Sequence, residues 1–125
     1  MGKWIGVDFD GVLATYGASQ GNALGKPVPA MVSRVKGWLR DKHEVRIFTA
    51  RAGDPHQKKA VSDWLAENGL AGLAVTNVKD FDMLELWDDR AVRVIKNTGK
   101  PCSGCKSAGY SVVDADTELE TMTDC

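Results

Sequence analysis

The sequence predicts an α/β domain in three layers, α/β/α and Rossmann-like, with a mainly parallel sheet between helices. Short apolar runs alternate along the chain with longer segments whose apolar residues recur at helical spacing, which is typical of parallel strands joined by helices. Polar side chains follow these apolar runs, as expected where strands of an open α/β sheet end beside a ligand. Right-handed crossovers are expected to place helices on both faces of the sheet.

The first half of the chain supplies a strand, a loop, a helix and a second strand. Residues 3–8 form a short apolar run, and Gly6 within it indicates a close approach of neighbouring chain. Residues 15–27 combine glycines with Ser, Gln and Asn, so we expect a loop there. Apolar residues at helical spacing predict a helix over 28–41, and Val45, Ile47 and Phe48 predict a strand over 44–49.

The second half continues the alternation of helices and strands. Asp54 can cap a helix that begins at Pro55, Gln57 would complete a capping box, and Gly69 would close the helix. We then expect elements at the following positions: a strand at 73–78, a turn or short helix at 81–84, a strand at 84–87 and a candidate fifth strand at 91–95. We expect the folded domain to span 1–96 and residues 97–125 to form a loosely attached tail.

The overall composition excludes some classes of partner and site. Sixteen basic residues face seventeen acidic ones, so the net charge of -1 gives no broad attraction to nucleic acid or membranes. No apolar stretch has the length of a membrane span and no secretory signal is evident, so we expect a cytoplasmic protein. Cys102 and Cys105 form a lone C-x-x-C pair that lacks two further zinc ligands, which favours a solvated, Gly-rich turn.

Polar side chains from four predicted strands are expected to meet at one edge of the sheet. These side chains belong to Asp8, Asp10, Thr49, Lys79, Asp88 and Asp89. Residues two apart in an extended chain point the same way, so Asp8 and Asp10 can face one site while Phe9 enters the core. Clustered carboxylates repel one another, and a hard cation such as Mg²⁺ removes that repulsion. A lysine and a hydroxyl beside such a cation outline a phosphoryl-transfer site.

Four short segments carry a resemblance to a known family. They are Asp8-Phe9-Asp10-Gly11-Val12, Ile47-Phe48-Thr49-Ala50-Arg51, Thr76-Asn77-Val78-Lys79 and Trp87-Asp88-Asp89-Arg90. In this order, each at a predicted strand end, they resemble the motifs of the haloacid dehalogenase-like (HAD) phosphatases. The resemblance covers residues 3 to about 95. The loop at 15–27 is too short for the cap domain that this family often inserts, so we expect a small member without a cap.

The resemblance implies a catalytic role for each matched residue. Asp8 would be the nucleophile that forms an aspartyl-phosphate, and Asp10 would be the general acid/base. Thr49 would contact the transferring phosphoryl group, and Lys79, in competition with Lys58 or Lys59, would neutralise it. Mg²⁺ would be held by Asp8, by the backbone carbonyl of Asp10, and by Asp88 and Asp89, with Asp89 favoured as the direct ligand of that pair. The backbone amides of Phe9 and Ala50, together with Arg51, would bind the substrate phosphate.

The expected function is therefore a Mg²⁺-dependent phosphomonoester hydrolase. The missing cap and the Thr49-Ala50-Arg51 segment resemble the phosphatase half of polynucleotide kinase-phosphatases, which points to a nucleotide or polynucleotide-end phosphate as substrate. A small-molecule phosphate and a phosphoprotein stay open, as does the oligomeric state. One alternative is a receiver-like phosphoacceptor module, but such modules carry their acidic pair before the Thr, not after it. Another is an inactive HAD-like binding protein, which the complete set of candidate catalytic residues disfavours.

Overall fold

The computed structural model describes residues 2–17 and 20–102. The chain divides into two units, Met1–Asp88 and Asp89–Cys125, so the domain boundary expected after residue 96 lies inside the second unit. The helices and strands found within residues 2–17 and 20–102 belong to the first unit. They are β1 (Trp4–Val7), α1 (Pro29–Arg40), β2 (Glu44–Phe48), the short 3₁₀ helix η2 (Ala50–Gly53), α2 (Pro55–Glu67), β3 (Ala74–Thr76) and β4 (Met83–Trp87).

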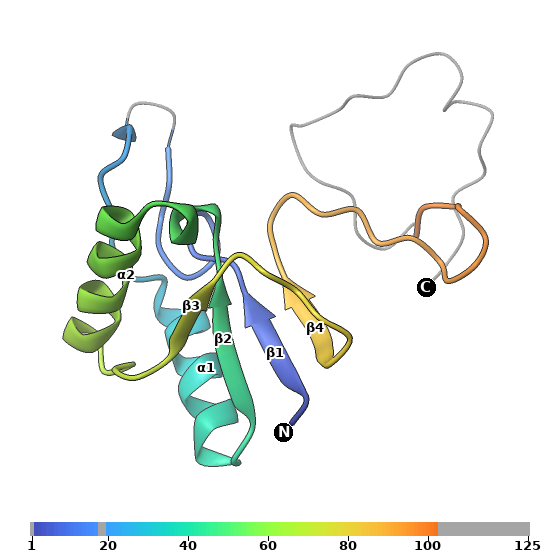
Figure 1. Ribbon diagram of the computed structural model, residues 1–125, viewed down its shortest axis with the longest axis horizontal. Coiled ribbons are helices and arrows are strands. Elements are labelled where there is room, and N and C mark those ends of the chain that lie inside the picture. Colours follow the sequence, from blue (N-terminus) through green and yellow to red (C-terminus); the bar gives the residue numbers. More distant parts are fainter. Residues whose placement is uncertain (1, 18–19, 103–125) are drawn as a thin grey trace. The chain divides into compact units, whose positions relative to one another are not determined.

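The four strands form one parallel sheet in the order β3-β2-β1-β4 (Figure 1). The first strand of the chain is therefore central, and it pairs with β2 on one side and β4 on the other. Because all four strands run in the same direction, their carboxyl ends share one edge of the sheet. The predicted α/β class with its parallel sheet is confirmed, and no cap domain interrupts the described residues.

Both helices cover the same face of the sheet. Side chains alternate along a strand, and the alternate residues Ile5 and Val7 of β1 point to this face. They join residues of the other strands and of both helices in one hydrophobic cluster, which includes Val45, Ile47, Val75, Met31, Val35, Val61, Trp64 and Leu65. Burying each large aliphatic side chain in such a cluster contributes about 1.5–3 kcal/mol to stability. This cluster is the core that holds the strand ends in place.

The opposite face of the sheet carries a connecting segment in place of a helix. Residues 77–82 leave β3 at the carboxyl edge and cross this face to reach the start of β4 (Figure 1). The indole Nε1 of Trp4 donates a hydrogen bond of 2.8 Å to Asp80 of the segment, and Arg46 lies 4.5 Å above the Trp4 ring. The expected second layer of helices is therefore not formed by the described residues, because this connection is too short to include one.

The start of α2 agrees with the capping residues predicted from the sequence, except at Gln57. Asp54 is the N-cap and accepts a hydrogen bond of 3.0 Å from the amide of His56, and Pro55 occupies the first turn. Gln57 does not close a capping box on the backbone amide of Asp54, because its side-chain oxygen accepts a hydrogen bond from Arg51 instead. None of the helices that the structure describes has the length and the apolar surface that crossing a membrane requires.

The described part of the second unit contains no regular strand. Residues 91–95, the candidate fifth strand, make only an isolated bridge between Val94 and Pro101. Their backbone pairs locally, since the amide of Ile95 donates to Lys100 and that of Cys102 donates to Arg93. Cys102 is fully buried and disulfide-bonded, in contrast to the solvated turn expected there. Cys105 and residues 103–125 lie outside the described residues.

Candidate functional site

The register of the central strands brings Asp8 beside Asp88. In the parallel pair of β1 and β4, Val7 is aligned with Trp87, and the amide of Asp8 donates a hydrogen bond of 2.9 Å to the Trp87 carbonyl. The residue that follows each strand therefore emerges at the same point of the carboxyl edge. Trp87 is anchored on the helix-covered face, where its ring lies 5.1 Å from that of Trp38.

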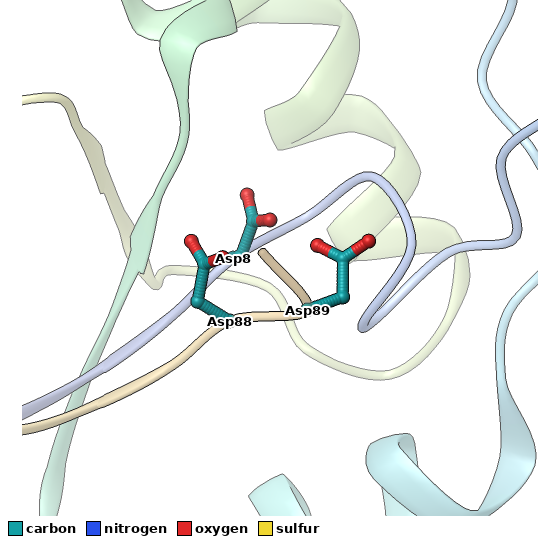
Figure 2. Close-up of side chains that lie close together, drawn as sticks. All are labelled: Asp8, Asp88 and Asp89. Carbon is teal, nitrogen blue, oxygen red and sulfur yellow. The ribbon is translucent and has the colours of Figure 1, made fainter. Parts of the chain in front are cut away.

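Asp8, Asp88 and Asp89 form a cluster of carboxylates. One oxygen from each side chain lies within 4.8 Å of the others, and all three carboxylates rise on the same side of the chain (Figure 2). Carboxylates this close repel one another when ionised, and a bound cation removes that repulsion. Oxygen ligands alone suit a hard cation such as Mg²⁺, and the three oxygens leave room for water or substrate oxygens. The residues expected to hold metal through their carboxylates are thus brought together.

A tight loop after β1 separates Asp8 from Asp10. Phe9 between them is fully buried, with its ring edge-on to Trp64 at 4.8 Å, so the two aspartates stay at the surface of the sheet edge. The Phe9 amide donates a hydrogen bond of 2.8 Å to the Asp8 carboxylate. Gly11 follows with a φ of 86°, a conformation that favours glycine. These features define the backbone conformation of the loop at the carboxyl edge of the sheet.

Asp10 is paired with Arg51 and not with the other aspartates. The guanidinium Nε lies 2.7 Å from Asp10 Oδ2, and Nη2 lies 2.8 Å from Asp10 Oδ1, so the pair is bidentate. Arg51 is 8% exposed and Asp10 is 24% exposed at their side chains. The hydrogen bond from Arg51 to Asp10 raises the pKa of Arg51, so the guanidinium stays charged. The sequence predicts that Arg51 binds the substrate phosphate. In the structure, its guanidinium donates hydrogen bonds to groups of the protein.

Thr49 and the residues after it continue the chain at the carboxyl end of β2. Thr49 directly follows β2, is 3% exposed, and its hydroxyl oxygen accepts a hydrogen bond of 3.1 Å from the amide of Arg51. Its own amide donates to Thr76 at the end of β3. Thr49 therefore caps the short helix η2, which begins at Ala50, and it keeps a hydroxyl hydrogen that can be donated.

Lys79 lies on the segment between β3 and β4 and not directly at the end of β3. β3 ends at Thr76, and Lys79 lies further along the segment that crosses the open face of the sheet. There it lines a cavity of about 430 Å³ together with Asp80, Phe81 and Met83. Of the alternatives, Lys59 forms an exposed ion pair with Asp63.

Sequence reasoning missed the partners that hold Arg51. Gln57 and the backbone carbonyls of Asn22 and Ala23 accept hydrogen bonds from its guanidinium. One available signal was the position of Arg51 two residues beyond the polar end of a buried strand, on the same edge as Asp10. The loop that supplies the two carbonyls carries no motif, so its approach to Arg51 could not be read from the chain.

Comparison with known proteins gives a similarity of fold. No family model matches the chain, and no curated protein does. The fold is similar to that of a conserved protein from Bacteroides thetaiotaomicron, with a TM-score of 0.58 over 74% of this chain and 79% of that protein. The two sequences are 22% identical, so the similarity concerns the fold alone. The similarity agrees with the α/β class of the sheet and helices.

Proposed function

We propose that the chain is a Mg²⁺-dependent phosphomonoester hydrolase that works through an aspartyl-phosphate on Asp8. One observation carries the proposal: three carboxylates with oxygens within 4.8 Å of one another lie at the carboxyl edge of a parallel sheet. Ligands of open α/β sheets bind outside this edge. A fourth carboxylate, Asp10, lies two residues from Asp8 and is held by Arg51. The resemblance of the four segments to HAD phosphatases supports the same activity.

The donor set fits Mg²⁺. The carboxylates of Asp8, Asp88 and Asp89 would hold the ion, with the backbone carbonyl of Asp10 as a further oxygen. When bound, Mg²⁺ would neutralise charge on the phosphoryl oxygens and on the cluster. The remaining steps are the work of the chain's own groups.

In the first step, a carboxylate oxygen of Asp8 attacks the phosphorus of the phosphate ester. A new bond forms between Asp8 and phosphorus while the bond from phosphorus to the leaving oxygen breaks. Protonated Asp10 gives its proton to that oxygen, which departs as an alcohol. The hydroxyl of Thr49 donates a hydrogen bond to the transferring group, and the amide of Ala50 is the proposed second donor.

In the second step, water attacks the phosphorus of the aspartyl-phosphate. Asp10, now a carboxylate, accepts a proton from this water, and the bond between Asp8 and phosphorus breaks. Inorganic phosphate leaves, Asp8 is regenerated, and Asp10 is protonated again. Lys79, on the segment between β3 and β4, keeps the proposed role of neutralising cation.

The open edge of the sheet favours an extended substrate, such as a nucleotide or a polynucleotide end. No inserted domain covers this edge within residues 2–17 and 20–102. The proposal is tested with a phosphatase panel in Mg²⁺ that includes p-nitrophenyl phosphate, nucleotides and 3′-phosphorylated oligonucleotides, run beside Asp8→Asn. We expect activity that depends on Mg²⁺ and is lost in the variant. Equal inactivity of both proteins on every substrate would contradict the enzyme proposal, and equal activity would remove Asp8 as nucleophile.

A further inference from the structure

Arg51 carries a buried positive charge whose donors are all used within the protein. A buried guanidinium is costly unless each of its N–H groups finds an acceptor. Nε donates to Asp10 Oδ2 at 2.7 Å, and Nη2 donates to Asp10 Oδ1 at 2.8 Å and to the Ala23 carbonyl at 3.5 Å. Nη1 donates to the Asn22 carbonyl at 2.8 Å and to Gln57 Oε1 at 3.0 Å. These contacts use the five donors that an arginine has.

The contacts of Arg51 fix its guanidinium from three segments of the chain. Asp10 belongs to the loop after β1, Asn22 and Ala23 to the loop before α1, and Gln57 to the first turn of α2. That second loop is held further by Trp64, whose indole donates a hydrogen bond of 2.9 Å to the Gly25 carbonyl. A bidentate pair of this kind sets the plane and direction of the carboxylate that it holds. Arg51 therefore decides where the oxygens of Asp10 point.

We propose that Arg51 is a positioning residue that fixes Asp10 for proton transfer to the leaving group and from water. The inference rests on the proposed function above, in which Asp10 is the general acid/base. Proton transfer needs the acid within hydrogen-bond reach of the leaving oxygen, so a freely rotating Asp10 is a poor catalyst. Each Asp10 oxygen accepts one hydrogen bond from Arg51 and keeps a further lone pair.

A positioning role through Asp10 has a signature that a purely structural role lacks. The p-nitrophenolate leaving group departs without a proton, whereas the alkoxide of an alkyl phosphate needs one. The value of kcat/KM reports steps up to formation of the aspartyl-phosphate, so it depends on the acid only for the alkyl substrate. Hydrolysis of the aspartyl-phosphate needs Asp10 as base with either substrate. A misplaced Asp10 therefore produces a burst of p-nitrophenol followed by slow turnover.

The experiment compares two substrates in Arg51→Lys, which keeps the charge and loses the bidentate geometry. The full-length protein is assayed with p-nitrophenyl phosphate and with a simple alkyl phosphate, beside Asp10→Asn and the control Asp63→Asn. We expect kcat/KM in Arg51→Lys to fall about 10²-fold for the alkyl phosphate and less than about fivefold for p-nitrophenyl phosphate, with a burst. Asp63→Asn, at an exposed ion pair on α2, leaves both substrates unchanged.

A second variant covers the case in which Arg51→Lys does not fold. Gln57→Glu keeps the shape of the side chain and adds a carboxylate that competes with Asp10 for the same guanidinium. We expect it to lower kcat/KM for the alkyl phosphate several-fold more than for p-nitrophenyl phosphate. Equal losses on both substrates in the folded variant overturn the positioning role while leaving the proposed function intact. If the wild type and Asp8→Asn are both inactive on all substrates, the proposed function itself fails.

Discussion

Asp8 and Asp10 stand two residues apart, yet the fold gives them opposite surroundings. Asp8 lies in a cluster with two other carboxylates, Asp88 and Asp89, and each contributes an oxygen within 4.8 Å of the others. Asp10 lies against the guanidinium of Arg51, at 2.7 and 2.8 Å. Asp8 is thus grouped with two other carboxylates, whereas Asp10 is paired with a guanidinium. This difference agrees with the tasks proposed for them: metal binding and nucleophilic attack for Asp8, and proton transfer from a fixed position for Asp10.

The contrast depends on which strand each aspartate faces. β4 lies on one side of β1 and delivers its acidic end to Asp8, while β2 lies on the other side and is followed by Arg51. The two aspartates after the central strand β1 therefore have different partners, because a different strand lies on each side of β1. Sequence spacing alone treats the two aspartates as equivalent, and the strand order separates them.

The largest expected effect is on activity at Asp8. Replacing Asp8 with Asn removes the proposed nucleophile and one proposed metal ligand, so we expect the rate with any active substrate to fall by about 10³-fold or more. Initial rates in excess Mg²⁺ measure this, with circular dichroism to confirm that the variant is folded. Asp63→Asn serves as the control and keeps the wild-type rate. A loss of less than tenfold in folded Asp8→Asn would falsify the assignment of Asp8.

The next effect is on stability at Asp10. Asp10→Asn leaves the buried charge of Arg51 without its carboxylate, and we expect the free energy of unfolding to fall by about 2–3 kcal/mol. The same change at Asp63, whose partner Lys59 is 77% exposed, is expected to cost less than about 1 kcal/mol. Urea unfolding of both variants measures the comparison. Similar costs at the two positions would mean that Arg51 does not depend on Asp10.

Metal binding distinguishes the carboxylate cluster around Asp8 from the pair of Asp10 and Arg51. A cation that binds only the folded protein raises the melting temperature in a concentration-dependent way. We expect Mg²⁺ to raise the melting temperature of the wild type and of Asp10→Asn, which keeps the three clustered carboxylates. In Asp88→Asn we expect the rise to be largely lost at the same Mg²⁺ concentration. If the rise in melting temperature with Mg²⁺ is lost in Asp10→Asn and kept in Asp88→Asn, the metal does not bind at the carboxylate cluster.

The smallest expected effect concerns Asp80, on the open face and away from both aspartates of the loop. The hydrogen bond from Trp4 lowers the pKa of Asp80 below its ordinary value of 3.8. A carboxyl whose pKa is lowered by folding stabilises the folded state at pH values above its ordinary pKa. This contribution is lost as the pH falls through the pKa of the folded state. The stability difference between wild type and Asp80→Asn should therefore be steady at about pH 6 and shrink near pH 3. Urea unfolding at both pH values measures it, and a difference that does not shrink contradicts the assignment.

Much of the fold follows from local pattern. The strands that became β1 to β4, both helices and the Asp54 cap could be predicted because apolar spacing and capping residues are local signals. The acidic cluster also follows, since parallel strands end at one edge. The missing second layer of helices and the crossing path of residues 77–82 could not be predicted, because they depend on where β4 pairs. The position of Lys79 depends on the same crossing path, so the sequence predicts it at the end of a strand and the structure has it on the connecting segment.

The bond between Asp10 and Arg51 shows a second limit. Arg51 looked like a substrate-binding residue because an arginine at a sheet edge suits a phosphate. The burial of Arg51 depends on the loop at 20–25, which folds back over its side chain. The sequence of that loop carries no pattern from which this path could be predicted. Contacts of this type depend on tertiary structure, and only coordinates reveal them.

The most direct test of the account is the location of the phosphoryl group during turnover. The protein is mixed with the best substrate of the panel in Mg²⁺, quenched in acid and digested, and the peptides are examined by mass spectrometry. We predict one phosphoryl group on Asp8 in the wild type, a larger trapped fraction in Asp10→Asn, and none in Asp8→Asn. Steady turnover with no phosphoryl group at Asp8 in either the wild type or Asp10→Asn would contradict the account.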